Sequence, residues 1–311
     1  MKNLSLFFRA TLLLILLTGT ALTSAAYDFV SGGIYYNITS STNMTVAVTY
    51  YSKTNNTYSG TVSIPEKVTY DGKTYYVTAI GESAFVGCTG LKGVNFTSDK
   101  TTSIGNYAFQ GCNGMTSFVI PPQITSIGNG VFNGCYGMTG LTIEESEETL
   151  SLGYTSSNGT NIGLFCKRPL TSVFIGRPLS YSTTSYGYSP FANNKTLVKA
   201  RLGKKLSSIP NYLFYGCTYL DEVTSCATTP PTANSNCFAN YEARLYVPIN
   251  SVNSYSQANV WKNFAYITGV DVGDDDEPIV PGWVIGDVDG DGLVNIYDVT
   301  ALIDYLLYGH F

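Results

Sequence analysis

The sequence predicts a mainly β solenoid of short stacked repeats, with a β cap before it and a small loop and helix after it. Three observations point to this class. Similar stretches begin at Ala79, Ser103 and Ser126, at intervals of 24 and 23 residues. Each repeat contains a short segment of alternating apolar side chains, which is typical of a half-buried strand. The composition then changes abruptly after Ile267, where acidic residues and prolines replace the repeat.

The first 26 residues have the three zones of a secretory signal peptide. Lys2 and Arg9 supply positive charge, Leu12 to Leu17 form a short apolar run, and Ser24 to Ala26 offer small residues for cleavage. The apolar run is shorter than the ~20 residues that cross a bilayer. No second long apolar run follows, and no cysteine lies near the cleavage point. We therefore expect a secreted, extracellular or cell-surface protein with no membrane span.

The charge balance of the chain limits its partners. The net charge of −5 becomes −7 once Lys2 and Arg9 are removed. An acidic chain without a basic cluster is poorly suited to nucleic acid or to an anionic membrane surface. Charged residues make up only 13% of the chain, and Tyr, Ser, Thr, Asn and Gly are abundant. This composition predicts an uncharged polar surface, as in extracellular β proteins.

Residues 27–76 are predicted to form the N-terminal β cap. An open solenoid end would pair with other chains, so it needs a cover. Asp71-Gly72 is a typical hairpin turn. The alternating segments of this region are Ile34 to Ile38, Thr45 to Tyr51, Thr57 to Ile64 and Thr74 to Ile80.

Residues 77–268 are predicted to form about seven repeats. No single repeat can bury its own apolar face, so the turns must stack. At ~4.8 Å between strands, seven turns give a body roughly 30 Å long. The segment Ser254 to Ile267, with Trp261, is expected to close the far end. The expected strands are Leu91 to Phe96, Met115 to Ile120, Met138 to Ile143, Leu170 to Ile175 and Leu197 to Leu202. One phenylalanine in each repeat is expected to point into the core, namely Phe85, Phe109, Phe132, Phe165, Phe191, Phe214 and Phe238.

Most of the seven cysteines recur at one place in the repeat. Cys88, Cys112, Cys135 and Cys217 each follow a glycine, and Cys166 falls at a comparable place. Equivalent positions in stacked turns form a column, so we interpret these residues as small buried hydrophobes. Cys226 and Cys237 lie outside that column, and the sequence leaves open whether they form a disulfide.

The repeats from about Tyr75 to Gly269 resemble the BspA-type leucine-rich repeats of surface proteins in anaerobic bacteria. The resemblance implies a right-handed leucine-rich-repeat solenoid with a sheet on one face. It also implies adhesion to host proteins or to other cells.

Two repeats carry extra residues. The chain takes five residues from Ile80 to Phe85, but 13 from Leu152 to Phe165 and ten from Tyr181 to Phe191. Insertions in neighbouring turns emerge on one face, which is often the binding face. The expected contact residues are Tyr154, Tyr181, Tyr186 and Tyr188, set among Ser, Thr and Asn as in contact loops. The alternative is that these are surface insertions without a partner. The neighbouring run Glu144, Glu145, Glu147 and Glu148 is interpreted as a solvated turn.

An acidic linker, residues 269–282, leads to a predicted calcium-binding segment at 283–311. Aspartates at alternate positions, Gly292 for the tight turn and a carboxylate at the twelfth position match an EF-hand-like loop. The expected calcium ligands are Asp287, Asp289, Asp291, the Leu293 carbonyl, Asn295 and Asp298. Apolar residues at helical spacing follow. The segment resembles a single type I dockerin repeat, whereas a dockerin has two such repeats. The resemblance implies a cohesin domain as partner.

The sequence argues against an enzyme. His310 is the only histidine, so Ser-His or Cys-His catalysis and histidine zinc sites are disfavoured. A glycosidase needs only two carboxylates, so composition alone does not exclude one. The sequence therefore favours a non-catalytic binding protein that captures a host or bacterial surface protein or a glycan. The alternative is a non-catalytic component of a dockerin–cohesin assembly for polysaccharide degradation.

Overall fold

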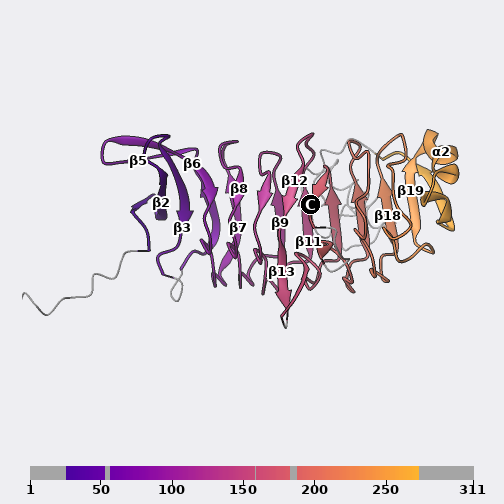
Figure 1. Cartoon of the computed structure of the whole chain (residues 1–311), viewed down its shortest axis with the longest axis horizontal. Helices are drawn as coiled ribbons and strands as arrows, with labels where there is room; N and C mark the ends of the chain where they lie inside the picture. Colours follow the sequence, from indigo (N-terminus) through magenta and orange to yellow (C-terminus); the bar gives the residue numbers. More distant parts are fainter. Residues whose placement is uncertain (1–25, 53–56, 158, 183–187, 273–311) are drawn as a thin grey trace, which may run out of the picture.

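The computed structural model describes residues 26–52, 57–157, 159–182 and 188–272, which form one elongated solenoid (Figure 1). The predicted signal peptide, apart from its last residue, and the predicted calcium segment lie outside these ranges. The mainly β fold and the stacking of short turns are as the sequence predicts.

The N-terminal cap is an antiparallel meander that turns into the solenoid. Strands β1 (Phe29–Ser31), β2 (Ile34–Ser40) and β3 (Thr45–Thr49) pair antiparallel, and β3 then pairs in parallel with β6 (Lys73–Ile80). A hairpin joins β5 (Lys67–Tyr70) to β6. Its turn residues have φ angles of 49° and 70°, which confirms the hairpin predicted at Asp71-Gly72.

A seven-stranded parallel sheet runs along one face of the solenoid (Figure 1). Its strands are in register, so Phe118 lies beside Leu141, and Ile120 lies beside Ile143, all pointing into the core. The repeat strands were predicted from Met115 and Met138, but the ladders begin two residues later. The strands of this sheet are β9 (Ser117–Ile120), β11 (Gly140–Ile143), β15 (Ser172–Ile175), β17 (Lys199–Leu202), β18 (Glu222–Ser225), β19 (Arg244–Pro248) and β20 (Tyr266–Val270).

A second sheet corrects the expectation of a sheet on one face only. From β6 it continues through β8 (Ser103–Ile104), β10 (Ser126–Ile127), β12 (Leu150–Leu152) and β16 (Leu179–Ser180), all parallel. These strands are too short to show an alternating pattern. The glycine after each Ser-Ile pair allows the close stacking, because a Cβ on Gly128 would lie 2.7 Å from the backbone nitrogen of Asn106.

The predicted phenylalanine column forms the centre of the core. Successive rings from Phe85 to Phe238 stack with centroids 5.2 to 5.9 Å apart. Tyr58 covers the first ring at 4.9 Å. Trp261, which is fully buried, and Phe264 cover the last, and this confirms the predicted closing segment. Around them lie the short helix α2 (Val252–Gln257) and the 3-10 turns η2 (Ile249–Ser251) and η3 (Trp261–Asn263).

The cysteine column has a role that the sequence did not indicate. The thiols of Cys112, Cys135 and Cys217 each donate to the carbonyl of the column phenylalanine in the preceding repeat, Phe85, Phe109 and Phe191, at 3.0 Å. In the two repeats between them, Arg168 Nη1 donates to the Phe132 carbonyl at 2.9 Å and Asn194 Nδ2 donates to the Phe165 carbonyl at 3.2 Å. We call the residues Cys112, Cys135, Arg168, Asn194 and Cys217 the donor column.

Cys166 does not belong to this column. It stands one residue after Phe165, whereas the column position is three residues after the phenylalanine and is taken by Arg168. The expectation for Cys166 was therefore wrong, because the column position in this repeat is held by a residue of another type. None of the seven cysteines, Cys226 and Cys237 included, forms a disulfide in the structure.

Candidate functional site

The first insertion folds into a hairpin that projects from the solenoid. Strands β13 (Tyr154–Ser157) and β14 (Thr160–Gly163) pair antiparallel, with Tyr154 opposite Gly163 and Ser156 opposite Asn161. Figure 1 shows β13 reaching beyond the edge of the stacked turns. We call this element the β13–β14 hairpin.

Tyr188, near the end of the second insertion, lies against the hairpin, as the sequence predicts for insertions in neighbouring turns. The rings of Tyr154 and Tyr188 meet edge to face, with centroids 5.4 Å apart at 88°. Asn161 Nδ2 donates to Tyr188 Oη at 3.2 Å. Both tyrosines are half-buried, so each ring is fixed by a neighbour while part of it stays accessible.

The base of the hairpin is held by a close backbone approach. A Cβ on Gly163 would lie 1.6 Å from the carbonyl oxygen of Ser189, so only glycine fits there. Ser189 is itself buried, and its hydroxyl donates to the Tyr212 carbonyl at 2.6 Å. The two insertions are therefore anchored on a rigid turn of the solenoid.

The other two predicted contact residues are not part of this cluster. Tyr181 packs against the core, and its hydroxyl donates to the Asn211 carbonyl at 2.9 Å. Burial raises the pKa of Tyr181 above its usual value. Tyr186 lies outside the described residues. The structure thus brings together Tyr154 and Tyr188, and it gives Tyr181 a structural contact.

The acidic run that precedes the hairpin in the sequence differs from the solvated turn that was expected. Glu147 and Glu148 are exposed, but Glu144 is half-buried near the fully buried Arg177. Arg177 donates to the carbonyls of Pro121 and Pro122, at 2.8 Å each. Burial raises the pKa of Glu144, and it lowers the pKa of Arg177 to about 10. Arg177 follows a strand as an isolated residue, so no sequence pattern indicated this role.

The six expected calcium ligands, Asp287, Asp289, Asp291, Leu293, Asn295 and Asp298, all lie outside the described residues. Calcium binding there stays a prediction. Within residues 26–52, 57–157, 159–182 and 188–272, no group of three or more His, Cys, Asp or Glu side chains is placed to hold a metal ion. In the same ranges, no helix is long and apolar enough to cross a membrane.

A mainly β solenoid of stacked leucine-rich turns with few helices defines the leucine-rich-repeat class of proteins. The model of the BspA-type leucine-rich repeat region matches residues 55–165 and 158–268, with six copies. The chain belongs to this family. None of the curated proteins compared with the chain matches it.

Solved structures with a similar chain are also leucine-rich-repeat proteins. One from Bacteroides ovatus is 23% identical, with a TM-score of 0.46, and the match covers 73% of this chain and 56% of that one. The chain thus spans little more than half the length of that protein. One from T. pallidum is 20% identical, with a TM-score of 0.43, over 66% of this chain and 86% of that one. A leucine-rich cell surface protein from Faecalibacterium prausnitzii is 16% identical, with a TM-score of 0.24, over 78% and 94%.

Proposed function

We propose that this protein is a secreted or cell-surface, non-catalytic binding protein, and that the β13–β14 hairpin with Tyr188 forms its contact site. The ligand class is a host or bacterial surface protein or glycan. The family match is to a repeat family and not to a catalytic one, which supports a binding role.

The single observation that carries the proposal is the Tyr154–Tyr188 pair with its Asn161 hydrogen bond. Tyrosine offers a large, rigid contact area at low entropic cost, and Asn, Ser and Thr add adaptable hydrogen bonds. A flat ring face beside an amide also suits a sugar ring, which has apolar faces and a hydroxyl rim. Because the residues are already held together, little order has to be created on binding.

The test is an array of glycans and extracellular-matrix proteins probed with the mature full-length chain. For any ligand captured, we expect Tyr154→Ala and Tyr188→Ala to weaken binding at least about tenfold, the loss typical of an aromatic anchor of ~1.4 kcal/mol. The matched control is Tyr219→Ala, which removes a tyrosine that is 64% exposed in another repeat. If both hairpin variants bind the ligand with unchanged affinity, the insertions are surface loops that do not take part in binding.

We also propose that residues 283–311 bind one calcium ion through the aspartate-rich loop. The support is the alternating spacing of Asp287, Asp289 and Asp291 with Asp298 at the twelfth position. Isothermal titration of the full-length mature chain should show one site, and Asp287→Ala should abolish it. Absence of binding at millimolar calcium would contradict the loop assignment.

The alternative function is a non-catalytic component of a dockerin–cohesin polysaccharide-degrading assembly. It rests on the resemblance of residues 283–311 to one dockerin repeat. Calcium-dependent capture of the mature chain by immobilised cohesin domains would support it. Failure of capture while calcium still binds would leave adhesion through the repeats as the function.

A further inference from the structure

The parallel sheet on the main face is broken after the first repeat. Strand β7 (Leu91–Phe96) pairs only with β4 (Gly60–Ile64), and the seven-stranded sheet starts afresh at β9. Strands β7 and β9 belong to different sheets, so they are not held at the ~4.8 Å that separates paired strands. From β9 onward every repeat continues the ladder to β20.

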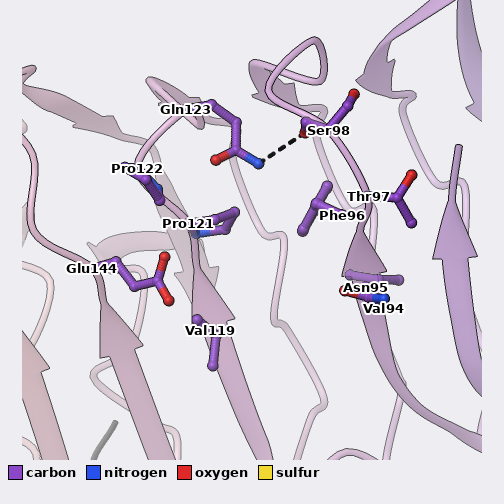
Figure 2. Close-up of a pocket in the computed structure, with 10 residues that line it drawn as sticks. All are labelled: Val94, Asn95, Phe96, Thr97, Ser98, Val119, Pro121, Pro122, Gln123 and Glu144. Atoms are coloured by element: carbon purple, nitrogen blue, oxygen red, sulfur yellow. Dashed lines mark hydrogen bonds between the residues drawn. The ribbon is translucent and has the colours of Figure 1, made fainter. Parts of the chain in front are cut away.

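A cavity of about 400 Å³ lies at this break, between β7 and β9 (Figure 2). Val94 and Phe96 line it, and they occupy the same repeat positions as Phe118 and Ile120. Phe118 and Ile120 are 3% and 0% exposed, but Val94 and Phe96 are only half-buried. The cavity therefore opens onto side chains that belong to the core. We call it the β7–β9 groove.

The groove is bounded at both ends. At one end the backbones touch, since a Cβ on Gly114 would lie 2.7 Å from the Leu91 carbonyl. At the other end Gln123 Nε2 donates to the Ser98 carbonyl at 3.2 Å, as the dashed line in Figure 2 shows. The groove thus has room for a short strand and not for a long one.

Both walls present unused backbone hydrogen-bonding groups. On β7, the Thr97 N–H donates to the Ile64 carbonyl, so the alternate residues Val94 and Phe96 turn their backbone groups toward β9. The Thr116 carbonyl accepts from the Gly140 N–H at the start of β11, and the Ile120 carbonyl accepts from the Glu144 N–H just after β11, so both residues face that strand. Because a strand turns alternate residues to opposite sides, the N–H and C=O groups of Ser117 and Val119 face β7. In the described part of the chain, no backbone hydrogen bond joins β7 to β9. Such edges are recognised by an extended peptide.

Charge selects among such peptides. The Glu144 carboxylate lines the groove beside Pro121 and Pro122, and Lys and Arg are absent from the lining side chains (Figure 2). The nearby Arg177 directs its guanidinium at the two proline carbonyls. An incoming basic side chain would therefore meet an acidic group in surroundings that strengthen their attraction.

We propose that the β7–β9 groove binds a short extended peptide that adds as a strand between β7 and β9. Apolar side chains of the peptide would face Val94 and Phe96, and a lysine or arginine would face Glu144. The bound strand would make the main sheet continuous from β4 to β20. This site is separate from the β13–β14 hairpin and does not depend on the function proposed for it.

The test uses a fluorescein-labelled peptide, acetyl-Thr-Val-Thr-Val-Thr-Lys-amide, and fluorescence anisotropy with the full-length mature chain. We expect saturable binding that weakens at least tenfold when the two valine amides are N-methylated, because methylation removes the strand hydrogen bonds. Replacing the peptide lysine with glutamate should weaken binding by a similar factor.

Protein variants locate the site. Glu144→Gln should weaken binding of the lysine peptide several-fold, and the matched control Glu148→Gln, an exposed neighbour in the same acidic run, should not. Val119→Lys, at a side chain that is 42% exposed, should abolish binding without a change in the thermal transition. Equal affinity for the N-methylated peptide would overturn the proposal, and so would no binding at millimolar peptide. Self-association that Val119→Lys abolishes, with no peptide binding, would instead assign the groove to a second copy of the chain.

Discussion

Replacing Cys112 with serine or with alanine tests what the donor column does. Cys112 is fully buried and donates to the Phe85 carbonyl at 3.0 Å. Serine keeps a donor of similar size, and alanine removes it. If the column positions were only small hydrophobes, alanine would be the better replacement.

The expected difference follows from the carbonyl that alanine leaves without a partner. An orphaned buried acceptor costs about 1–3 kcal/mol, and a typical hydrogen bond contributes about 1 kcal/mol net. Burying a serine hydroxyl costs little when it is satisfied. We therefore expect Cys112→Ser to be more stable than Cys112→Ala by about 1 kcal/mol, which is roughly 2–4 °C for a chain of this size.

Urea unfolding followed by circular dichroism measures this difference as a shift in midpoint at constant m value. The same order, serine above alanine, is expected at Cys135, whose thiol donates to the Phe109 carbonyl. A control in the same repeat is Ala108→Ser, since Ala108 is fully buried and adding a hydroxyl there should destabilise. Alanine equal to or better than serine at both cysteines would refute the donor role.

Three further outcomes can be measured on the same protein. Burial raises the pKa of Cys135 and Cys217 from 9.0 to about 11, so the stability that these thiols contribute is complete below pH 9 and is lost as pH rises toward 11. The urea midpoint should fall between these two pH values. All seven thiols should react with Ellman's reagent in urea but not in the folded protein. Gly163→Ala should destabilise by about 1–3 kcal/mol through the clash with Ser189 and should weaken hairpin-dependent ligand binding, as read by urea unfolding and by the array. Arg177→Met should cost about 2–5 kcal/mol in urea unfolding, because it leaves the carbonyls of Pro121 and Pro122 without a donor.

The sequence was sufficient for those parts of the fold that repeat. The spacing of the phenylalanines predicted one column, and the rings from Phe85 to Phe238 stack along it. Alternation predicted the strands of the main face, since one of their faces is buried. It also placed the two insertions side by side, because neighbouring turns must stack in register. These features follow from periodicity alone.

Features that depend on a single repeat were not predictable in the same way. Arg168 takes the donor position three residues after Phe165, and a search for repeated cysteines finds the nearby Cys166 instead. Tyr181 and Tyr188 are the same residue type and lie seven residues apart, yet the Tyr181 hydroxyl donates to the Asn211 carbonyl and Tyr188 packs against the hairpin. Which tyrosine side chain points inward depends on the free volume beside the neighbouring turn. That volume cannot be read from a single sequence.

The β7–β9 groove shows why a break in the ladder is difficult to predict from spacing. From Phe96 to Ile104 the chain takes eight residues, but from Ile120 to Ile127 it takes seven. Both stretches connect a strand of the main face to a strand of the second sheet, and both ends are fixed by ladders or by core contacts. The corner after β11 is longer still, at nine residues from Ile143 to Leu152, yet β11 stays paired with β9 and β15. The length of a corner by itself therefore does not open the ladder. The first repeat differs from the others in its neighbour, because β7 pairs with β4 of the N-terminal cap and not with a strand of another repeat. The junction between the cap and the repeats is thus the place where this stacked protein exposes a backbone edge and core side chains to a partner.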